Sequence, residues 1–138
     1  MQVIKDDEFI KITFDEEYSL LATKWRPSSF DDVSDEYVKQ VITEISDALA
    51  STQADYYLAD QSNRGIVYTE DMQKYVFNML LSGGIRGNLK KCAVVQSIDF
   101  FVGMSNEQML KEGVTNIPYK CFSTREDAFK WLGVKDNE

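Results

Sequence analysis

Polar residues gather where three apolar runs of this sequence end, and they carry most of the chemistry that the chain could perform. Carboxyl ends of parallel strands meet at one edge of a sheet, where ligands commonly bind and where helix amino ends offer free N–H groups. We therefore expect these residues to converge and to suit a polar or anionic group. They could also serve only as caps and turns. The three groups are Asp60-Gln61-Ser62-Asn63-Arg64, then Gln96, Ser97 and Asp99, then Ser123-Thr124-Arg125.

From these strand ends and the helix that follows the first of them, we select residues for ligand or partner binding. Asp60 and Arg64 would be the centre of a catalytic site if the chain were an enzyme, although they could equally form a surface ion pair of little energetic value. Thr69 is the candidate for phosphorylation, because phosphate is tolerated at a helix amino end. The full set is Asp60, Ser62, Asn63, Arg64, Tyr68, Thr69, Ser97 and Asp99.

Several kinds of catalytic and metal site are excluded by composition. The chain has no histidine, so it cannot form a Ser-His or Cys-His nucleophile system. Cys92 and Cys121 fall in apparent strands at a spacing that matches no zinc pattern, and we expect two buried, reduced thiols. The glycines around Gly83-Gly84 follow a helical pattern and indicate a helix stop, not a phosphate loop. We expect no metal and no cofactor.

The first half of the chain predicts a hairpin, a helix and a buried strand. Alternating apolar residues predict strands at 8–14 and 18–25, joined by a turn so short that they must be antiparallel. Ser34 is a good N-cap for a helix whose apolar residues recur every three or four positions. That stripe is Val38, Val41, Ile42, Ile45, Ala48 and Leu49. The apolar run Tyr56–Ala59 then predicts a buried strand.

The second half predicts further β-α units. A helix capped by Thr69 should bury Met72, Val76, Met79 and Leu80. A strand follows at 91–96 and a third helix at 106–112, where Ser105 and Gln108 resemble a capping box. The last strand covers 118–122. The final helix begins at a second capping box, Ser123 with Glu126, and ends at Gly133.

The order of these elements defines the fold class. We predict an α/β domain over residues 1–138, with an N-terminal β-hairpin followed by β-α repeats. Its mixed, mostly parallel sheet has about five strands, and about four helices cover it. The polar tail 135–138 is expected to fray.

Charge and hydropathy restrict the partners and the location. The net charge of −8 repels a phosphate backbone, so nucleic acid is a poor partner. No apolar run reaches the ~18 residues of a spanning helix, and the N-terminus lacks the pattern of a signal peptide, so we predict no membrane insertion and a cytoplasmic protein.

The middle of the chain is rich in aromatic residues and methionine, which would form ordinary core, line an apolar pocket or make a partner-binding groove. Tyr75 and Phe77 fall outside the main stripe of their helix, which favours an exposed interface. We leave the choice between monomer and homodimer open. The residues in question are Tyr68, Met72, Tyr75, Phe77, Met79, Phe100, Phe101, Met104 and Met109.

The layout and the closing segment resemble a known group of domains. The chain has a hairpin, a strand that ends Asp-x-Ser and a closing Phe-Ser-x-x-x-x-Ala-x-x-Trp-Leu pattern at residues 122–132. In these features it resembles the SpoIIAA-like group of STAS domains, and more closely small stand-alone bacterial STAS/SEC14-like proteins. Members that act as anti-sigma antagonists carry a phosphorylated serine in Asp-Ser-Ser-Gly; this chain has Val67-Tyr68-Thr69-Glu70-Asp71 at the corresponding place. The resemblance implies a SpoIIAA-like fold and a regulatory or binding role.

These observations lead to three functional hypotheses. The first is a non-catalytic binding or regulatory module for a protein partner or a small apolar or anionic ligand. The alternative is a phosphorylatable signalling switch that acts through Thr69 or Ser62. The third is an enzyme with a site centred on Asp60 and Arg64.

Overall fold

Six strands form one mixed sheet in the computed structural model of the chain, which describes residues 1–26, 34–62, 70–96 and 117–136. The strands lie side by side in chain order, β1-β2-β3-β4-β5-β6. β1, β2 and β3 are antiparallel, whereas β3 to β6 are parallel. The strands are β1 (Gln2–Asp6), β2 (Ile10–Asp15), β3 (Leu20–Trp25), β4 (Tyr56–Gln61), β5 (Lys91–Gln96) and β6 (Tyr119–Phe122).

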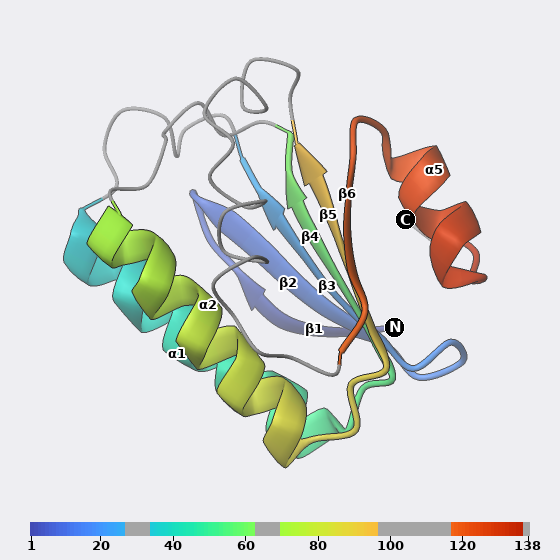
Figure 1. Ribbon diagram of the computed structural model, residues 1–138, viewed down its shortest axis with the longest axis horizontal. Helices are drawn as coiled ribbons and strands as arrows, with labels where there is room; N and C mark the ends of the chain where they lie inside the picture. Colours follow the sequence, from blue (N-terminus) through green and yellow to red (C-terminus); the bar gives the residue numbers. More distant parts are fainter. Residues whose placement is uncertain (27–33, 63–69, 97–116, 137–138) are drawn as a thin grey trace.

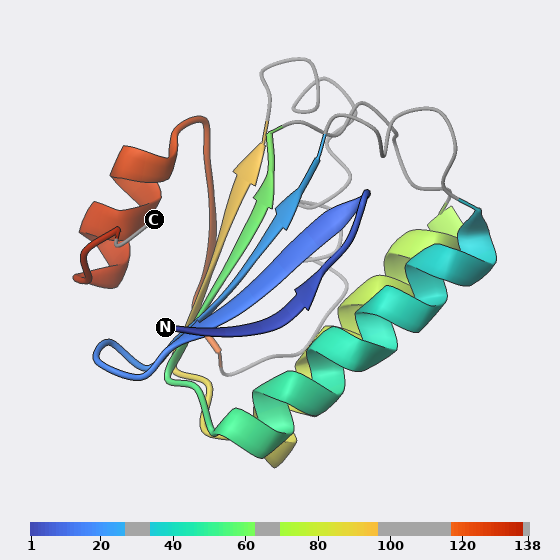
Figure 2. The ribbon, with the colours of Figure 1, turned by 180° about the vertical axis from the view of Figure 1, so that it is seen from behind.

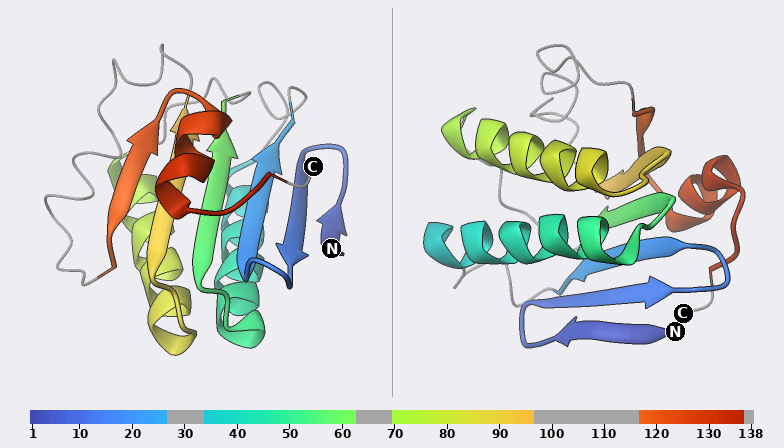
Figure 3. Two further views of the ribbon diagram at one scale, coloured as in Figure 1. Left: turned by 90° about the vertical axis from the view of Figure 1, so that its right-hand side faces the viewer. Right: turned by 90° about the horizontal axis from the view of Figure 1, so that it is seen from below.

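Helices cover both faces of the sheet. α1 (Asp35–Thr52) and α2 (Glu70–Arg86) lie side by side on one face, while α5 (Arg125–Leu132) lies on the other (Figures 1 and 2). The same three layers are visible when the molecule is seen from below in Figure 3. The chain is therefore an α/β protein, as the sequence predicts.

The strand order has a consequence for ligand binding. Because the strands follow one another without reversal, successive crossovers of one hand place α1 and α2 on the same face. A crevice between helices that diverge onto opposite faces arises where strand order reverses. The described strands contain no such reversal, so a site at the strand ends has to be built by side chains and loops.

Two apolar cores hold the layers together. The larger core lies between the sheet and the α1–α2 pair and includes Trp25, Ile45 and Leu49. The smaller core lies under α5 and includes Leu58, Val95 and Phe129. Neighbouring residues of β4 contribute to opposite cores, because side chains of a strand alternate between the faces of the sheet.

α1 forms where the sequence predicts a helix, and for the predicted reason. The Ser34 side chain accepts a hydrogen bond from the Tyr37 N–H and so caps the first turn. All six residues of the expected stripe are buried, together with Ser46. The helix ends at Gln53, which adopts a left-handed conformation with φ of 55°.

α2 differs from the prediction, because Gly83-Gly84 does not stop the helix. α2 continues to Arg86, and Gly83 and Gly87 face α1. A Cβ at Gly83 would lie 2.6 Å from the Ser46 Oγ and closer still to the Ser46 carbonyl oxygen. A Cβ at Gly87 would similarly strike the Leu49 carbonyl oxygen. The two glycines are therefore required for the close packing of α2 against α1. A prediction that treats glycine only as a local helix breaker does not detect this contact between helices.

Tyr75 also lies differently from the expectation of an exposed aromatic surface. It is half-buried, packs against the larger core and has its hydroxyl 3.2 Å from the Thr43 Oγ1. The helix expected at 106–112, the Thr69 cap and the Phe77 side chain lie outside the part of the chain that the structure describes.

The ends of the chain differ from the prediction as well. An additional edge strand, β1, precedes the expected hairpin, so the sheet has six strands instead of five. The described residues contain three helices. The N-cap of α5 is Thr124 and not Ser123, since the Thr124 Oγ1 accepts from the Asp127 N–H. Gly133 ends α5 as predicted, with φ of 77°.

Among the described helices, none is both long and apolar enough to cross a membrane.

Candidate functional site

The end of β4 presents different chemistry to the two faces of the sheet. Asp60 follows Leu58 on the α5 face, and Gln61 follows Tyr57 and Ala59 on the face covered by α1 and α2. Both side chains are buried, with exposed fractions of 1% for Asp60 and 8% for Gln61. Buried polar groups of this kind need partners, so their hydrogen bonds decide what each can do.

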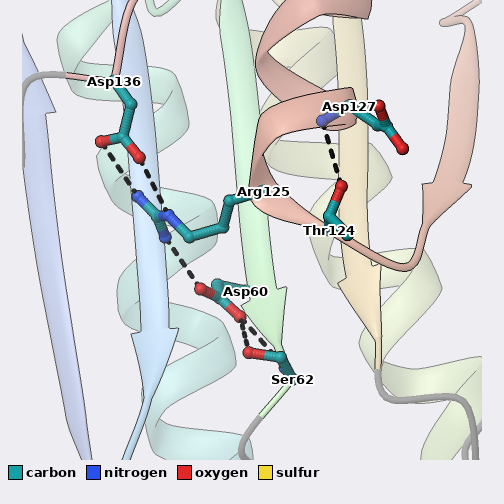
Figure 4. A network of polar contacts seen from close by, with 6 residues as sticks. All are labelled: Asp60, Ser62, Thr124, Arg125, Asp127 and Asp136. Carbon is teal, nitrogen blue, oxygen red and sulfur yellow. Dashed lines mark hydrogen bonds and ion pairs between the residues drawn. The ribbon is translucent and has the colours of Figure 1, made fainter.

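Asp60 is fully engaged by its surroundings (Figure 4). Its Oδ2 accepts a 2.8 Å hydrogen bond from Nη1 of Arg125, which belongs to the first turn of α5. Its Oδ1 accepts from the Ser62 backbone N–H at 3.0 Å and from the Ser62 hydroxyl at 2.6 Å. The carboxylate therefore joins β4 to α5 and fixes the turn that leaves the strand.

Arg125 extends this network toward the end of the chain. Its Nε and Nη2 donate to the carboxylate of Asp136 at 3.2 and 3.4 Å, and its guanidinium lies 5.3 Å from the centre of the Phe129 ring. Burial acts to lower the pKa of Arg125, but the hydrogen bonds and charges of Asp136 and Asp60 outweigh it, so the pKa is raised. The guanidinium thus remains charged between two carboxylates. Asp136, expected in a frayed tail, is held by Arg125.

The hollow that the described residues form beside this network is small. A hollow next to Arg125, lined also by Thr13, Asp15 and Asp136, has a volume of about 10 Å³. Such a space accommodates about one water molecule. Since both oxygens of Asp60 already accept hydrogen bonds, the arrangement joins elements and does not present a carboxylate to a substrate.

Gln61 is the polar side chain that the described structure leaves unsatisfied. Its Oε1 is buried and has no hydrogen-bond partner among the residues that the structure describes. An orphaned buried acceptor costs about 1–3 kcal/mol, so native proteins rarely retain one without a bound water, ion or ligand, or a functional role. The carboxamide lies at the last residue of β4, at the edge where the sequence predicts binding.

The structure brings together part of the predicted convergence. Because β4, β5 and β6 are parallel, their carboxyl ends share one edge, and Asp60 meets Arg125 across it. The cationic partner of Asp60 in the described structure is thus 65 residues away in the sequence, and the possible ion pair with Arg64 stays a prediction. Six candidates lie outside the described residues: Asn63, Arg64, Tyr68, Thr69, Ser97 and Asp99.

A second polar cluster, which the sequence reading missed, surrounds Asp7 in the turn between β1 and β2. The backbone N–H groups of Phe9 and Ile10 donate to the Asp7 Oδ1, and the Tyr37 hydroxyl donates to its Oδ2. Burial acts to raise the pKa of Asp7, but these bonds and the charge of Lys5 lower it below its usual value. The signal in the sequence that could have revealed this cluster is an Asp two or three residues before a strand, where its side chain can accept hydrogen bonds from the backbone of the turn.

Cys92 and Cys121 lie on the neighbouring strands β5 and β6 and are not joined by a disulfide; Cys121 is half-buried, whereas the sequence predicts two buried thiols. Cys92 is buried, and this burial, with a contribution from Cys121, raises its pKa. A raised pKa keeps Cys92 in the poorly nucleophilic thiol form. No group of His, Cys, Asp and Glu that could hold a metal ion exists among the residues that the structure describes.

Fold and site together define an α/β protein with a mixed sheet and a buried polar strand end. Comparison with known proteins adds no identity to this class. No protein-family model matches the chain, and no curated protein or solved structure matches it significantly.

Proposed function

We propose that this chain is a non-catalytic binding module, and that its ligand or partner donates a hydrogen bond to Gln61 at the carboxyl end of β4. The observation that carries the proposal is the buried Gln61 Oε1, which accepts no hydrogen bond within the described part of the chain. A ligand N–H or O–H at this position would satisfy the acceptor and recover the free energy that its burial costs.

The absence of catalysis is supported by the state of Asp60. A general base must reach the proton that it removes. Asp60 is 1% exposed and uses both oxygens to accept hydrogen bonds from Arg125 and Ser62. Releasing it would break the ion pair between β4 and α5.

A phosphorylation switch at Ser62 has less support. The Ser62 hydroxyl donates to Asp60, so a phosphate there would replace that donor with negative charge beside a buried carboxylate. Thr69 lies outside the described residues, and its role stays a prediction. The finer assignment to the SpoIIAA-like group likewise rests on the closing pattern 122–132.

Thermal unfolding tests the binding proposal. The protein is purified gently from its own host, and the sample is divided into two halves. One half of the sample is unfolded, stripped of small molecules and refolded, and the other half is left untreated. We expect the untreated half to melt higher, because a bound ligand stabilises the native state. In Gln61→Leu the two halves should melt alike, and the refolded variant should be at least as stable as refolded wild type, since the orphaned acceptor is gone.

The matched control is Gln40→Leu, which makes the same change on the exposed side of α1. It should keep the difference between untreated and refolded protein. If untreated and refolded wild type melt alike, or if Gln61→Leu keeps the full difference, the proposal is wrong.

A further inference from the structure

Four charged residues form a row across the α5 face of the sheet. Strand register places Asp6 beside Lys11, Lys11 beside Lys24, and Lys24 beside Asp60. Partners in register lie on the same face with Cβ atoms about 4.5–5.5 Å apart in antiparallel pairs. Two lysines therefore stand directly opposite each other, with a carboxylate on either side.

Both carboxylates of the row are occupied by other cations. Asp6 forms an ion pair with Arg26 at 2.5 Å, and Asp60 binds Arg125 at 2.8 Å. Neither Lys11 nor Lys24 forms an ion pair within the ranges that the structure describes. Among the described residues, the two positive charges consequently face each other without an ion-pair partner of their own.

This placement is unfavourable for the protein alone. Like charges directly opposite on neighbouring strands destabilise a sheet. Lysines often protect exposed sheet edges from aggregation, but β2 and β3 are each paired on both sides, so that explanation does not apply. Both lysine side chains are half-buried, so water screens their repulsion only in part. The chain is also rich in acidic residues, with 23 in total, so a shortage of carboxylates does not explain the missing ion pairs.

We propose that Lys11 and Lys24 together bind a phosphate group. A phosphate carries about −1.5 to −2 charges at neutral pH and so matches two ammonium groups, whereas a carboxylate matches one. Lysine binds phosphate as a point charge and needs no fixed planar geometry. α5 covers the β4–β6 part of this face, and no described helix lies over β1 and β2 (Figure 3). The segment after α5 crosses the same face beside Thr13 and Ala22, two residues along the strands from Lys11 and Lys24, which are themselves only half-buried.

This site is independent of the proposed role of Gln61, which lies on the opposite face. Either can fail without the other. The phosphate could be free inorganic phosphate or part of a phosphorylated molecule, because both present the same oxygens.

The test is an NMR titration that follows the side-chain signals of isotope-labelled lysines at low ionic strength, where exposed charges are least screened. Inorganic phosphate, O-phosphoserine and acetate are added separately. We expect saturable shifts with phosphate-containing probes and about tenfold weaker binding in Lys11→Gln or Lys24→Gln, which corresponds to a loss of about 1.4 kcal/mol. Tighter binding of O-phosphoserine than of phosphate would support a phosphorylated molecule; the reverse order would support the free ion.

Lys39→Gln is the control, because it removes one positive charge from α1 on the other face. It should bind phosphate like wild type. Without phosphate, Lys24→Gln should unfold at a temperature no lower than wild type, which verifies that the variant folds and that repulsion is relieved. No saturable shift in wild type, equal weakening in Lys39→Gln, or acetate binding as tight as phosphate would overturn the proposal.

Discussion

At the scale of single residues, Arg125 connects three parts of the chain that are distant in sequence. It neutralises the buried Asp60 of β4 from the first turn of α5 and also binds Asp136 after that helix. Removing one member of a buried ion pair strands the other charge in a poorly polar environment. The pair should therefore matter for stability, unlike an exposed ion pair.

We predict that Arg125→Leu lowers the free energy of unfolding by about 3 kcal/mol, measured by urea denaturation. The double variant Asp60→Asn/Arg125→Leu should be more stable than Arg125→Leu, because the stranded charge is then absent. The control, Lys130→Ala, removes the exposed partner of Glu126 and should cost less than about 0.5 kcal/mol. Equal costs for Arg125→Leu and Lys130→Ala would refute this role.

Asp7 makes stability depend on acid. Its pKa is lowered in the folded state, so its contribution is fully present above the unfolded pKa of about 3.9 and is lost as the pH falls through the lower folded pKa. We predict that Asp7→Asn flattens the loss of unfolding free energy between about pH 5 and pH 2, measured by urea denaturation at each pH.

Two further variants check the cause of this pH dependence. Tyr37→Phe removes the donor to the Asp7 Oδ2, so it should raise the Asp7 pKa toward its ordinary value and reduce the acid-dependent loss. Glu16→Gln changes an exposed carboxylate in the turn after β2 and should leave most of the acid profile intact. An unchanged profile in Asp7→Asn would contradict the assignment.

At the scale of elements, the contact between α1 and α2 depends on glycine. Gly83 and Gly87 lie one helical turn apart and bring α2 against the backbone of α1 at Ser46 and Leu49. Since the obstructing atoms include a carbonyl oxygen, they cannot be relieved by a side-chain rotation. The helices would have to separate to admit a methyl group.

We predict that Gly83→Ala lowers the free energy of unfolding by about 1–3 kcal/mol through overpacking, although alanine favours a helix by about 1 kcal/mol. The neighbouring Ser82→Ala should be neutral or slightly stabilising, because Ser82 is exposed. Chemical denaturation of both variants gives the comparison. A Gly83→Ala protein as stable as wild type would show that the helices can separate at no cost.

Sequence patterns predict elements well where periodicity and capping act locally. The boundaries of β5 and the cap and stripe of α1 follow from short-range chemistry and are confirmed. β1 was missed because its burial is slight and its alternation is interrupted by a bulge between Val3 and Lys5. The helix that passes through Gly83-Gly84 was missed because its cause is contact with another helix, which no local pattern records.

At the scale of the whole molecule, the sheet determines which polar residues meet. The sequence predicts the α/β class and the shared edge of the parallel strands, but register and helix placement select the actual partners. Asp60 therefore pairs with Arg125 of α5, and Lys11 lies opposite Lys24 across the hairpin. Those partners are 65 and 13 residues apart, and only the assembled sheet identifies them.

The strand order also bears on where a ligand binds. With no reversal among the described strands, those strands supply no crevice of this kind, and the proposed binding function rests on the individual side chain of Gln61. The site is thus narrowed from the strand ends in general to one side chain. The ligand or partner that donates to Gln61 should be detectable by its mass.

Native mass spectrometry of the protein, purified gently from its own host, tests that claim most directly. We predict that the wild-type chain retains an additional mass, either a small molecule or a partner, that Gln61→Leu loses and Gln40→Leu keeps. A bare polypeptide mass for the wild type, or an additional mass that Gln61→Leu retains unchanged, would contradict the proposed binding function.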